Sequence, residues 1–121
     1  MLDYKTIGKL GEAAAASYLQ KLGYRILQRN YCTPIGELDI VCSLGNVLVF
    51  VEVKSRTSTS FGEAYLAVNA KKQQKLRKLA LYYIMLECKA EPEYQFDIVS
   101  LWMQKQTGAV LDLQHYKNAF V

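Results

Sequence analysis

Hydrophobic and polar residues alternate with a period of two in two neighbouring stretches of the chain, residues 36–42 and 47–54. This alternation is typical of β-strands that turn one face towards a hydrophobic core. The dipeptide Gly45-Asn46 between the two stretches favours a tight hairpin turn, because both residues tolerate a positive φ angle. The pattern therefore predicts a β-hairpin in the first half of the chain.

The length of this turn decides which charged residues face each other across the hairpin. In a two-residue loop Leu44 pairs with Val47. Counting back then places Asp39 opposite Glu52, and a four-residue loop makes the two residues diagonal neighbours on the same face. Directly opposed side chains are about 4.5–5.5 Å apart at Cβ, and like charges there are destabilising. The pair therefore predicts a bound cation, and a hard ion such as Mg²⁺ suits two carboxylates.

Lys54 follows Glu52 by two residues and so lies on the same strand face, next to the expected ion. Its ammonium group can stabilise charge on a phosphate or orient a water molecule. The alternative is a surface strand whose charges are solvated and whose Glu52 and Lys54 form a local ion pair. The opposite face of the first strand is apolar and carries Leu38, Ile40 and Cys42.

The pattern in the rest of the chain predicts a helix near the start and three further strands. The helix spans residues 7–22 and ends at Gly23. Its expected buried stripe is Ile7, Leu10, Gly11, Ala14, Tyr18 and Leu22, and the lack of bulk at Gly8 and Gly11 lets another element approach closely. The strands are predicted over residues 24–31, 94–102 and 109–113, with a polar loop over residues 55–60.

A second helix is predicted over residues 70–88, with a buried stripe of Leu76, Leu79, Ala80, Tyr83 and Ile84. Lys72 and Gln73 continue this stripe at the helix start, where polar groups either look into a cavity or mark the solvent edge. The opposite side of the same turns carries Lys71, Lys75 and Lys78. Such a lysine stripe is either a solvated helix face or a surface that follows phosphates.

Composition limits the class of protein. The length fits one domain, residues 1–121, and 51% hydrophobic with 21% charged residues is ordinary for a globular protein. A net charge of +4 permits nucleic-acid binding without requiring it. Three widely spaced cysteines and the lack of a signal or membrane-spanning run predict a cytoplasmic protein with reduced thiols and no membrane association.

The rarer residue types exclude several chemistries. His115 is the only histidine, which excludes Ser-His-Asp and multi-histidine zinc sites. The chain has no glycine-rich phosphate loop, so nucleoside-triphosphate chemistry has no support. Asp97, in the predicted strand over residues 94–102, is either a third acidic group of the site or one half of a structural ion pair.

The predicted order of elements, with an acidic hairpin face followed by Glu52-Val53-Lys54, resembles the PD-(D/E)xK nuclease superfamily of restriction-endonuclease-like folds. Together, short motifs along the whole chain make it similar to the YraN-like family of small bacterial proteins. These motifs are Gly8-Lys9-Leu10-Gly11-Glu12, Gly23-Tyr24, Gly36-Glu37-Leu38-Asp39, Val51-Glu52-Val53-Lys54-Ser55-Arg56, Lys72-Gln73 with Leu76, Phe96-Asp97 and Asn118-Ala119-Phe120. That family is itself similar to archaeal Holliday-junction resolvases. The resemblance implies an α/β fold with a restriction-endonuclease-like core, element order α-β-β-β-α-β-β and a mixed central sheet flanked by helices.

The resemblance also implies which residues form a site. Asp39 matches the acidic residue of the first motif strand, and Glu52 with Lys54 matches the Glu-x-Lys. Glu12 matches the first-helix glutamate of the resolvase-like branch, and Gln73 a glutamine found on a helix near the site. Two positions depart from common family patterns, Leu38 in place of the proline and Asn69 in place of an aspartate.

The implied activity is hydrolysis of phosphodiester bonds in DNA, including branched DNA, with Mg²⁺ or Mn²⁺ as cofactor. The metal ligands are expected to be Glu12, Asp39 and Glu52, and the catalytic group Asp39, Glu52, Lys54 and Gln73. Arg56, Lys71, Lys72, Lys75 and Lys78 are expected to contact the nucleic acid. A non-cleaving nucleic-acid-binding module on the same fold and a protein-interaction adaptor stay open as alternatives. A nuclease of this size is expected to engage DNA as a homodimer, although nothing in the sequence fixes an interface.

Overall fold

The computed structural model of this chain, which describes residues 1–57 and 69–120, has an α/β fold. Its elements are α1 (Tyr4–Lys21), β1 (Arg25–Thr33), β2 (Gly36–Leu44), β3 (Val47–Arg56), α2 (Ala70–Glu87), β4 (Glu93–Met103) and β5 (Val110–Phe120). This is the predicted order α-β-β-β-α-β-β. No helix in the described ranges is long and apolar enough to cross a membrane.

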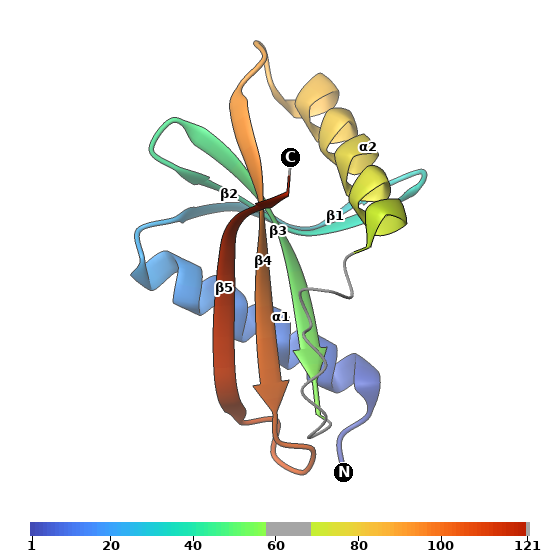
Figure 1. Ribbon diagram of the computed structural model, residues 1–121, viewed down its shortest axis with the longest axis vertical. Helices are drawn as coiled ribbons and strands as arrows, with labels where there is room; N and C mark the ends of the chain where they lie inside the picture. Colours follow the sequence, from blue (N-terminus) through green and yellow to red (C-terminus); the bar gives the residue numbers. More distant parts are fainter. Residues whose placement is uncertain (58–68, 121) are drawn as a thin grey trace.

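The strands form one five-stranded sheet in the order β1-β2-β3-β4-β5. The sheet is mixed, as predicted, because β3 and β4 run parallel while the other neighbours run antiparallel. The parallel pair requires a crossover, and α2 lies in that connection. Helix α1 packs on one face of the sheet and α2 on the other, as Figure 1 shows, with a separate hydrophobic cluster beneath each helix.

Helix α1 lies closer to the sheet than its larger apolar residues suggest. Its buried residues are Ile7, Gly11, Ala15, Ala16 and Leu19, whereas Leu10 and Leu22 are 40% and 48% exposed. A Cβ at Gly11 would lie 1.9 Å from Ser55 Oγ of β3, so only glycine allows this approach. Gly8 has nothing within 4 Å of such a Cβ. Ile7 and Gly11 of the predicted stripe are therefore confirmed, and Ala14 and Tyr18 pack against the same cluster. Leu10 and Leu22 were wrongly included, because the small residues set the contact face.

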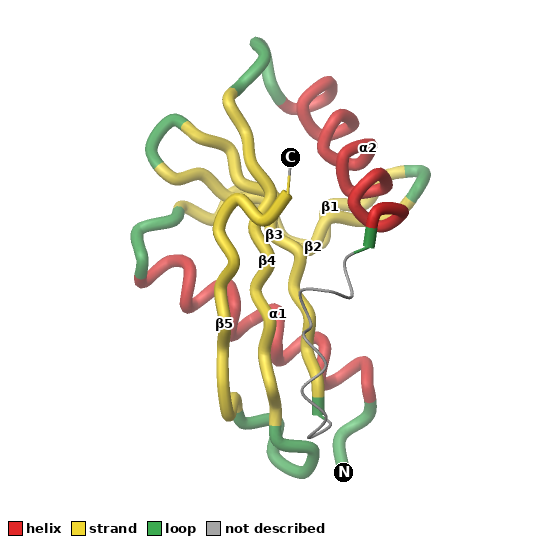
Figure 2. Tube along the Cα trace, in the orientation of Figure 1, coloured by secondary structure: helices red, strands yellow, loops and turns green. Residues whose placement is uncertain are grey.

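The central hairpin has the predicted register. Leu44 pairs with Val47 across the Gly45-Asn46 turn, and the β2–β3 ladder runs back to the pair of Ile40 with Val51. Beyond that pair the structure pairs β2 with β1 only, down to Gly36 at the hairpin tip. Figure 2 shows this β1–β2 arm passing β3 to the side on which α2 lies.

Leu38 corrects the predicted strand face. Ile40 and Cys42 belong to the cluster beneath α1, but Leu38 packs with Tyr31 in the cluster beneath α2. The single apolar face predicted for β2 is therefore broken, because the hairpin arm leaves β3 and turns its apolar residues to the second helix.

Two strands extend further than predicted. Strand β3 includes Ser55 and Arg56, which were expected in a loop, and residues 58–60 of that loop lie outside the described residues. Strand β5 continues to Phe120 instead of ending at residue 113. Its last residues are held by packing, since the Phe120 ring stacks on that of Phe96 with centroids 4.8 Å apart.

Candidate functional site

Asp39 and Glu52 lie where β2 separates from β3. They follow the last ladder pair, Ile40 with Val51, in the register of the hairpin. The backbone N–H of Val53 donates a hydrogen bond to Asp39 Oδ2 at 2.9 Å. The Asp39 carboxylate thus satisfies a backbone donor at the point where the ladder ends, and this bond holds it beside β3.

Glu52 is a buried carboxylate, 8% exposed. Burial, together with the charge of the neighbouring Asp39 and a hydrogen bond to it, raises the pKa of Glu52 to about 7 against the opposing charges of Lys72 and Lys54. The two ammonium nitrogens lie 3.8 Å (Lys72) and 3.9 Å (Lys54) from Glu52 Oε1. These contacts are ion pairs longer than ordinary charge-assisted hydrogen bonds. Negative charge at this position is therefore only partly compensated by the protein.

Lys72 lies next to the carboxylate pair, unlike the other lysines at the start of α2. Lys72 was predicted to contact nucleic acid together with the other lysines of α2, and in the structure its ammonium group lies beside the buried Glu52. The signal was present in the helical pattern, because Lys72 continues the inward stripe of α2 at the helix start. Asn69 caps that helix, accepting a hydrogen bond from the backbone N–H of Lys72 at 2.9 Å.

Glu12 approaches the pair from the other helix. Burial raises the pKa of this half-buried carboxyl group and the charge of Asp39 raises it further, against a hydrogen bond from Asn30 and the charge of Arg29. Glu12 is therefore within electrostatic reach of Asp39. In residues 1–57 and 69–120, no three His, Cys, Asp or Glu side chains come close enough together to form a metal cage.

The donor set at the pair nevertheless fits a hydrated Mg²⁺ ion. This ion takes oxygen ligands and commonly keeps several waters while one or two carboxylates bind it directly. Asp39 uses Oδ2 for the Val53 N–H, which leaves Oδ1 for an ion. The raised pKa of Glu52 reflects burial beside a second carboxylate, an environment that a divalent cation would relieve.

Two further predicted residues lie on neighbouring surfaces. Arg56 follows Lys54 by two residues at the end of β3, so Glu52, Lys54 and Arg56 share one strand face. Gln73, on α2, is half-buried and accepts a hydrogen bond from Arg77 Nη2 at 3.5 Å. The catalytic role of Gln73 stays a prediction.

A pocket of about 550 Å³ lies between the first turns of α2 and the tip of the β1–β2 hairpin. We call it the lysine pocket; it is lined by Ile35, Asn69, Lys71, Lys72, Gln74, Lys75 and Lys78. All four predicted phosphate-contacting lysines of α2 therefore border one concave surface. Lys72 connects this surface with the carboxylate pair, since it belongs to both.

Asp97 lies away from the carboxylate pair. It is fully buried and pairs with Val51 in the parallel ladder, whereas Glu52 pairs with Ile98, so the two acids point to opposite faces. Asp97 Oδ2 lies 2.7 Å from His115 Nε2. Of the two alternatives for Asp97, the structure favours the structural one, because its buried carboxyl group contacts His115 and lies apart from the carboxylate pair.

Comparison with known proteins places these residues in a family. Residues 11–101 match the model of the uncharacterised protein family UPF0102. A UPF0102 protein of Pelotomaculum thermopropionicum is 44% identical over 116 residues, which cover 96% of each chain. Another, of Thermodesulfovibrio yellowstonii, is 46% identical over 114 residues, covering 94% of this chain and 95% of the relative. A third, of Caldanaerobacter subterraneus, is 41% identical over 119 residues, 98% of each chain. The chain therefore belongs to the UPF0102 family, the family of YraN-like proteins.

Proposed function

We propose that this protein is a metal-dependent endonuclease that hydrolyses phosphodiester bonds in DNA and that its α/β fold is of the restriction-endonuclease type. The observation that carries the proposal is the buried Glu52 carboxyl group beside Asp39, with the ammonium nitrogen of Lys54 3.9 Å away. A buried carboxyl group beside a second carboxylate is costly for stability, and such arrangements concentrate at functional sites.

The carboxylates of Asp39 and Glu52 would hold the cofactor, with Glu12 contacting it through water. Bound Mg²⁺ or Mn²⁺ lowers the pKa of a coordinated water and neutralises charge on the scissile phosphate. Lys72 favours the ionised form of Glu52, because its positive charge lowers the pKa of that carboxyl group against the effect of burial.

The remaining polar groups would act on the substrate. Lys54 lies on the same strand face as Glu52, where it would orient the attacking water and stabilise charge developing on the phosphate oxygens. Gln73, one residue after Lys72 on α2, would orient a water or a phosphate oxygen. Arg56 would contact the backbone of the DNA next to the scissile bond.

Calorimetric titration with Mg²⁺ and Mn²⁺, with and without a four-way DNA junction, tests the carboxylate pair. The wild type is expected to bind metal and Asp39→Asn to lose that binding, and gels of the same samples are expected to show metal-dependent cleavage of the junction by the wild type only. Glu37→Gln, on the same strand two residues away, is the matched control and is expected to retain both. Failure of the wild type to bind metal even with DNA present would overturn the proposal.

A non-cleaving nucleic-acid-binding module is the second candidate, and the lysine pocket favours it, since four cations around one concave surface suit a phosphate backbone without requiring catalysis. DNA binding that persists in the absence of metal, with no cleavage of any junction or duplex, would favour this candidate over the nuclease.

A further inference from the structure

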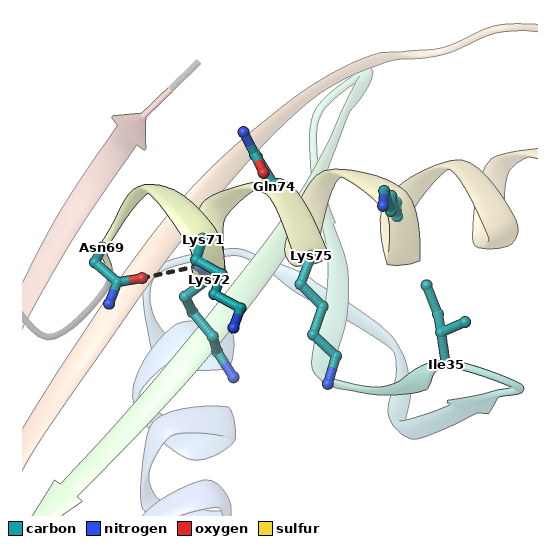
Figure 3. Close-up of a pocket in the computed structure, with 7 residues that line it drawn as sticks. Ile35, Asn69, Lys71, Lys72, Gln74 and Lys75 are labelled. Carbon is teal, nitrogen blue, oxygen red and sulfur yellow. Dashed lines mark hydrogen bonds between the residues drawn. The ribbon is translucent and has the colours of Figure 1, made fainter.

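The lysine pocket has two unlike walls. One wall is formed by the first turns of α2, and the side chains of Lys71, Lys72 and Lys75 extend from the same side of this helix, as Figure 3 shows. The other wall is the β1–β2 hairpin tip, where Ile35 is 39% exposed. A chain of phosphates along the first wall would therefore place its bases towards an apolar side chain.

The charge along the helix wall is of one sign. Among the residues that the structure describes, the lining includes four lysines and no acidic residue. Lys71, Lys75 and Lys78 are four and three residues apart, which corresponds to about 6 and 4.5 Å along the axis of an α-helix. A row of cations of this kind suits a phosphate backbone, whose charges it can neutralise one after another.

The hairpin wall limits what can enter. Lys75 lies against the hairpin, since a Cβ at Gly36 would come within 3.2 Å of its Cε atom. The pocket is open to solvent, and its volume of about 550 Å³ is in the range of ligand pockets, about 300–1,000 Å³. One or two nucleotides match that size, and a double helix does not. An unpaired strand also exposes its bases to a side chain such as Ile35, whereas paired bases are stacked inside the duplex.

The pocket continues to the carboxylate pair, because Lys72 lines it and also lies 3.8 Å from Glu52. We propose that the lysine pocket binds a single, unpaired nucleic-acid strand next to the scissile phosphate, so that the substrates are DNA molecules with a single-stranded arm. This inference rests on the proposed nuclease function, and it names the class of substrate that the function would use.

The test measures binding without cleavage. Fluorescence anisotropy in the presence of EDTA compares three labelled probes: a short oligothymidylate, a blunt duplex, and a fork that carries the oligothymidylate as an arm. The wild type is expected to bind the strand and the fork more tightly than the duplex. Lys71→Gln/Lys78→Gln should weaken both by about tenfold and make the slope of log K against log salt shallower by about 1.4, since each single-strand phosphate contact contributes about 0.7. This variant spares Lys72 and Lys75, which contact the protein itself.

Two further variants separate the pocket from general charge. Lys21→Gln/Lys105→Gln removes the same charge from exposed positions outside the pocket and is expected to leave all affinities unchanged. Ile35→Ser is expected to weaken binding of the strand without changing the salt slope, because it removes an apolar contact and no charge.

The outcomes distinguish this inference from the proposed nuclease function. Equal affinity for duplex and strand, or an equal loss in the Lys21/Lys105 control, would overturn the pocket inference even if the protein cleaves DNA. Preference for the strand that depends on Lys71 and Lys78, without metal-dependent cleavage of the fork, would leave the pocket supported and the nuclease function refuted. Cleavage of the fork but not of the blunt duplex, reduced in the pocket variant, supports both.

Discussion

Glu52 and Asp97 are the charged side chains that the described part of the molecule buries, at 8% and 0% exposure, and they lie on adjacent parallel strands. They differ in their partners. Asp97 receives hydrogen bonds from Tyr24 Oη at 3.2 Å, Gln95 Nε2 at 2.9 Å and the Asn118 backbone N–H at 3.0 Å, and lies 2.7 Å from His115 Nε2. Both of its oxygens are satisfied inside the protein.

Among the described residues, Glu52 has no comparable set of partners. Its two cations lie 3.8 and 3.9 Å away, and its other close neighbour is the carboxylate of Asp39, which raises its pKa. A buried carboxyl group with a full set of donors stabilises the fold, whereas one beside a second carboxylate is ready for a cation. Burial alone therefore does not distinguish structural from functional acids, and the set of partners does.

The regions around Asp39 and Asp97 share one structural feature. Asp39 accepts from Val53 N–H where β2 leaves β3, and Asp97 accepts from Asn118 N–H where the β4–β5 register shifts. In each case a carboxylate replaces a backbone partner at a break in the sheet. Only at the first break does a second acid lie alongside, and that is what makes the first break a candidate site.

The largest expected effect is a loss of stability on substitution of Asp97, the acid with a structural role. Asp97→Ala removes the acceptor for a buried histidine, a tyrosine and a backbone N–H, and breaking such a buried pair costs about 3–5 kcal/mol of stability. Urea unfolding followed by circular dichroism measures this loss. The control is Asp112→Ala, an exposed aspartate of β5, expected to change stability by less than about 0.5 kcal/mol. A similarly small loss for Asp97→Ala would contradict the structural role.

Lys54→Ala affects the other region, and there the expected loss is in activity. Under the proposed function, cleavage of a DNA junction in single-turnover gels falls by about 10²–10³-fold, the usual cost of removing one group that stabilises developing charge. Lys54 is only half-buried, near the end of β3, so urea unfolding should change little. The matched control is Lys21→Ala, at an exposed position of α1, which should cleave like the wild type. Cleavage by Lys54→Ala at the wild-type rate would refute its assignment.

The pH dependence of the stability of Glu52→Gln tests the contrast between Glu52 and Asp97. The folded-state pKa of Glu52 is raised to about 7 from 4.5, so between these values the folded protein binds more protons than the unfolded chain. Stability contributed by this group is therefore present below pH 4.5 and lost as pH rises through 7, by up to about 3 kcal/mol. In EDTA, the variant should exceed the wild type in stability at pH 8 and approach it near pH 5, as measured by urea unfolding at each pH.

Added Mg²⁺ provides the counterpart to that pH series. Because a ligand that binds only the folded state stabilises it, Mg²⁺ should raise the stability of the wild type at pH 8 and leave Glu52→Gln nearly unchanged. A pH-independent difference between the two proteins would show that Glu52 titrates normally, and the contrast with Asp97 would lose its electrostatic basis.

The arrangement of the first region, around Asp39 and Glu52, could be predicted almost completely from the sequence. A two-residue Gly45-Asn46 turn fixes the register of β2 on β3, and that register alone brings Asp39 to Glu52. Local geometry of this kind can be read from the chain because few residues separate the partners. The contact of Lys72 with Glu52 could be anticipated only as an inward direction on α2, since it depends on how the helix lies over the sheet.

The second region could not be predicted, because its parts are far apart in sequence. Asp97 and His115 meet only through the pairing of β4 with β5. The residues around His115 are mostly polar, so the hydrophobic pattern did not predict that β5 continues through them. The exposure of Leu10 and Leu22 was missed for a related reason: the lack of bulk at Gly11 indicated a close approach, but how α1 then lies on the sheet depends on tertiary packing. Packing between distant elements is what the hydrophobic pattern leaves unspecified.

The smallest expected effect concerns the outer edge of the Asp97 region. Tyr18 Oη lies 3.1 Å from His115 Nδ1, and this contact links α1 to β5 through the histidine that faces Asp97. Tyr18→Phe removes one hydrogen bond and leaves the ring in place, so a loss of about 1 kcal/mol is expected in urea unfolding. Tyr4→Phe is the matched control on the same helix, because Tyr4 is 91% exposed and should give no measurable change. If Tyr18→Phe costs as little as Tyr4→Phe, the region ends at Asp97 and His115, and α1 is held by apolar packing and Tyr24. A loss near 1 kcal/mol would show that α1, through Tyr18, also belongs to the hydrogen-bonded surroundings of Asp97. Glu52 lacks such a complete set of partners in the described part of the chain.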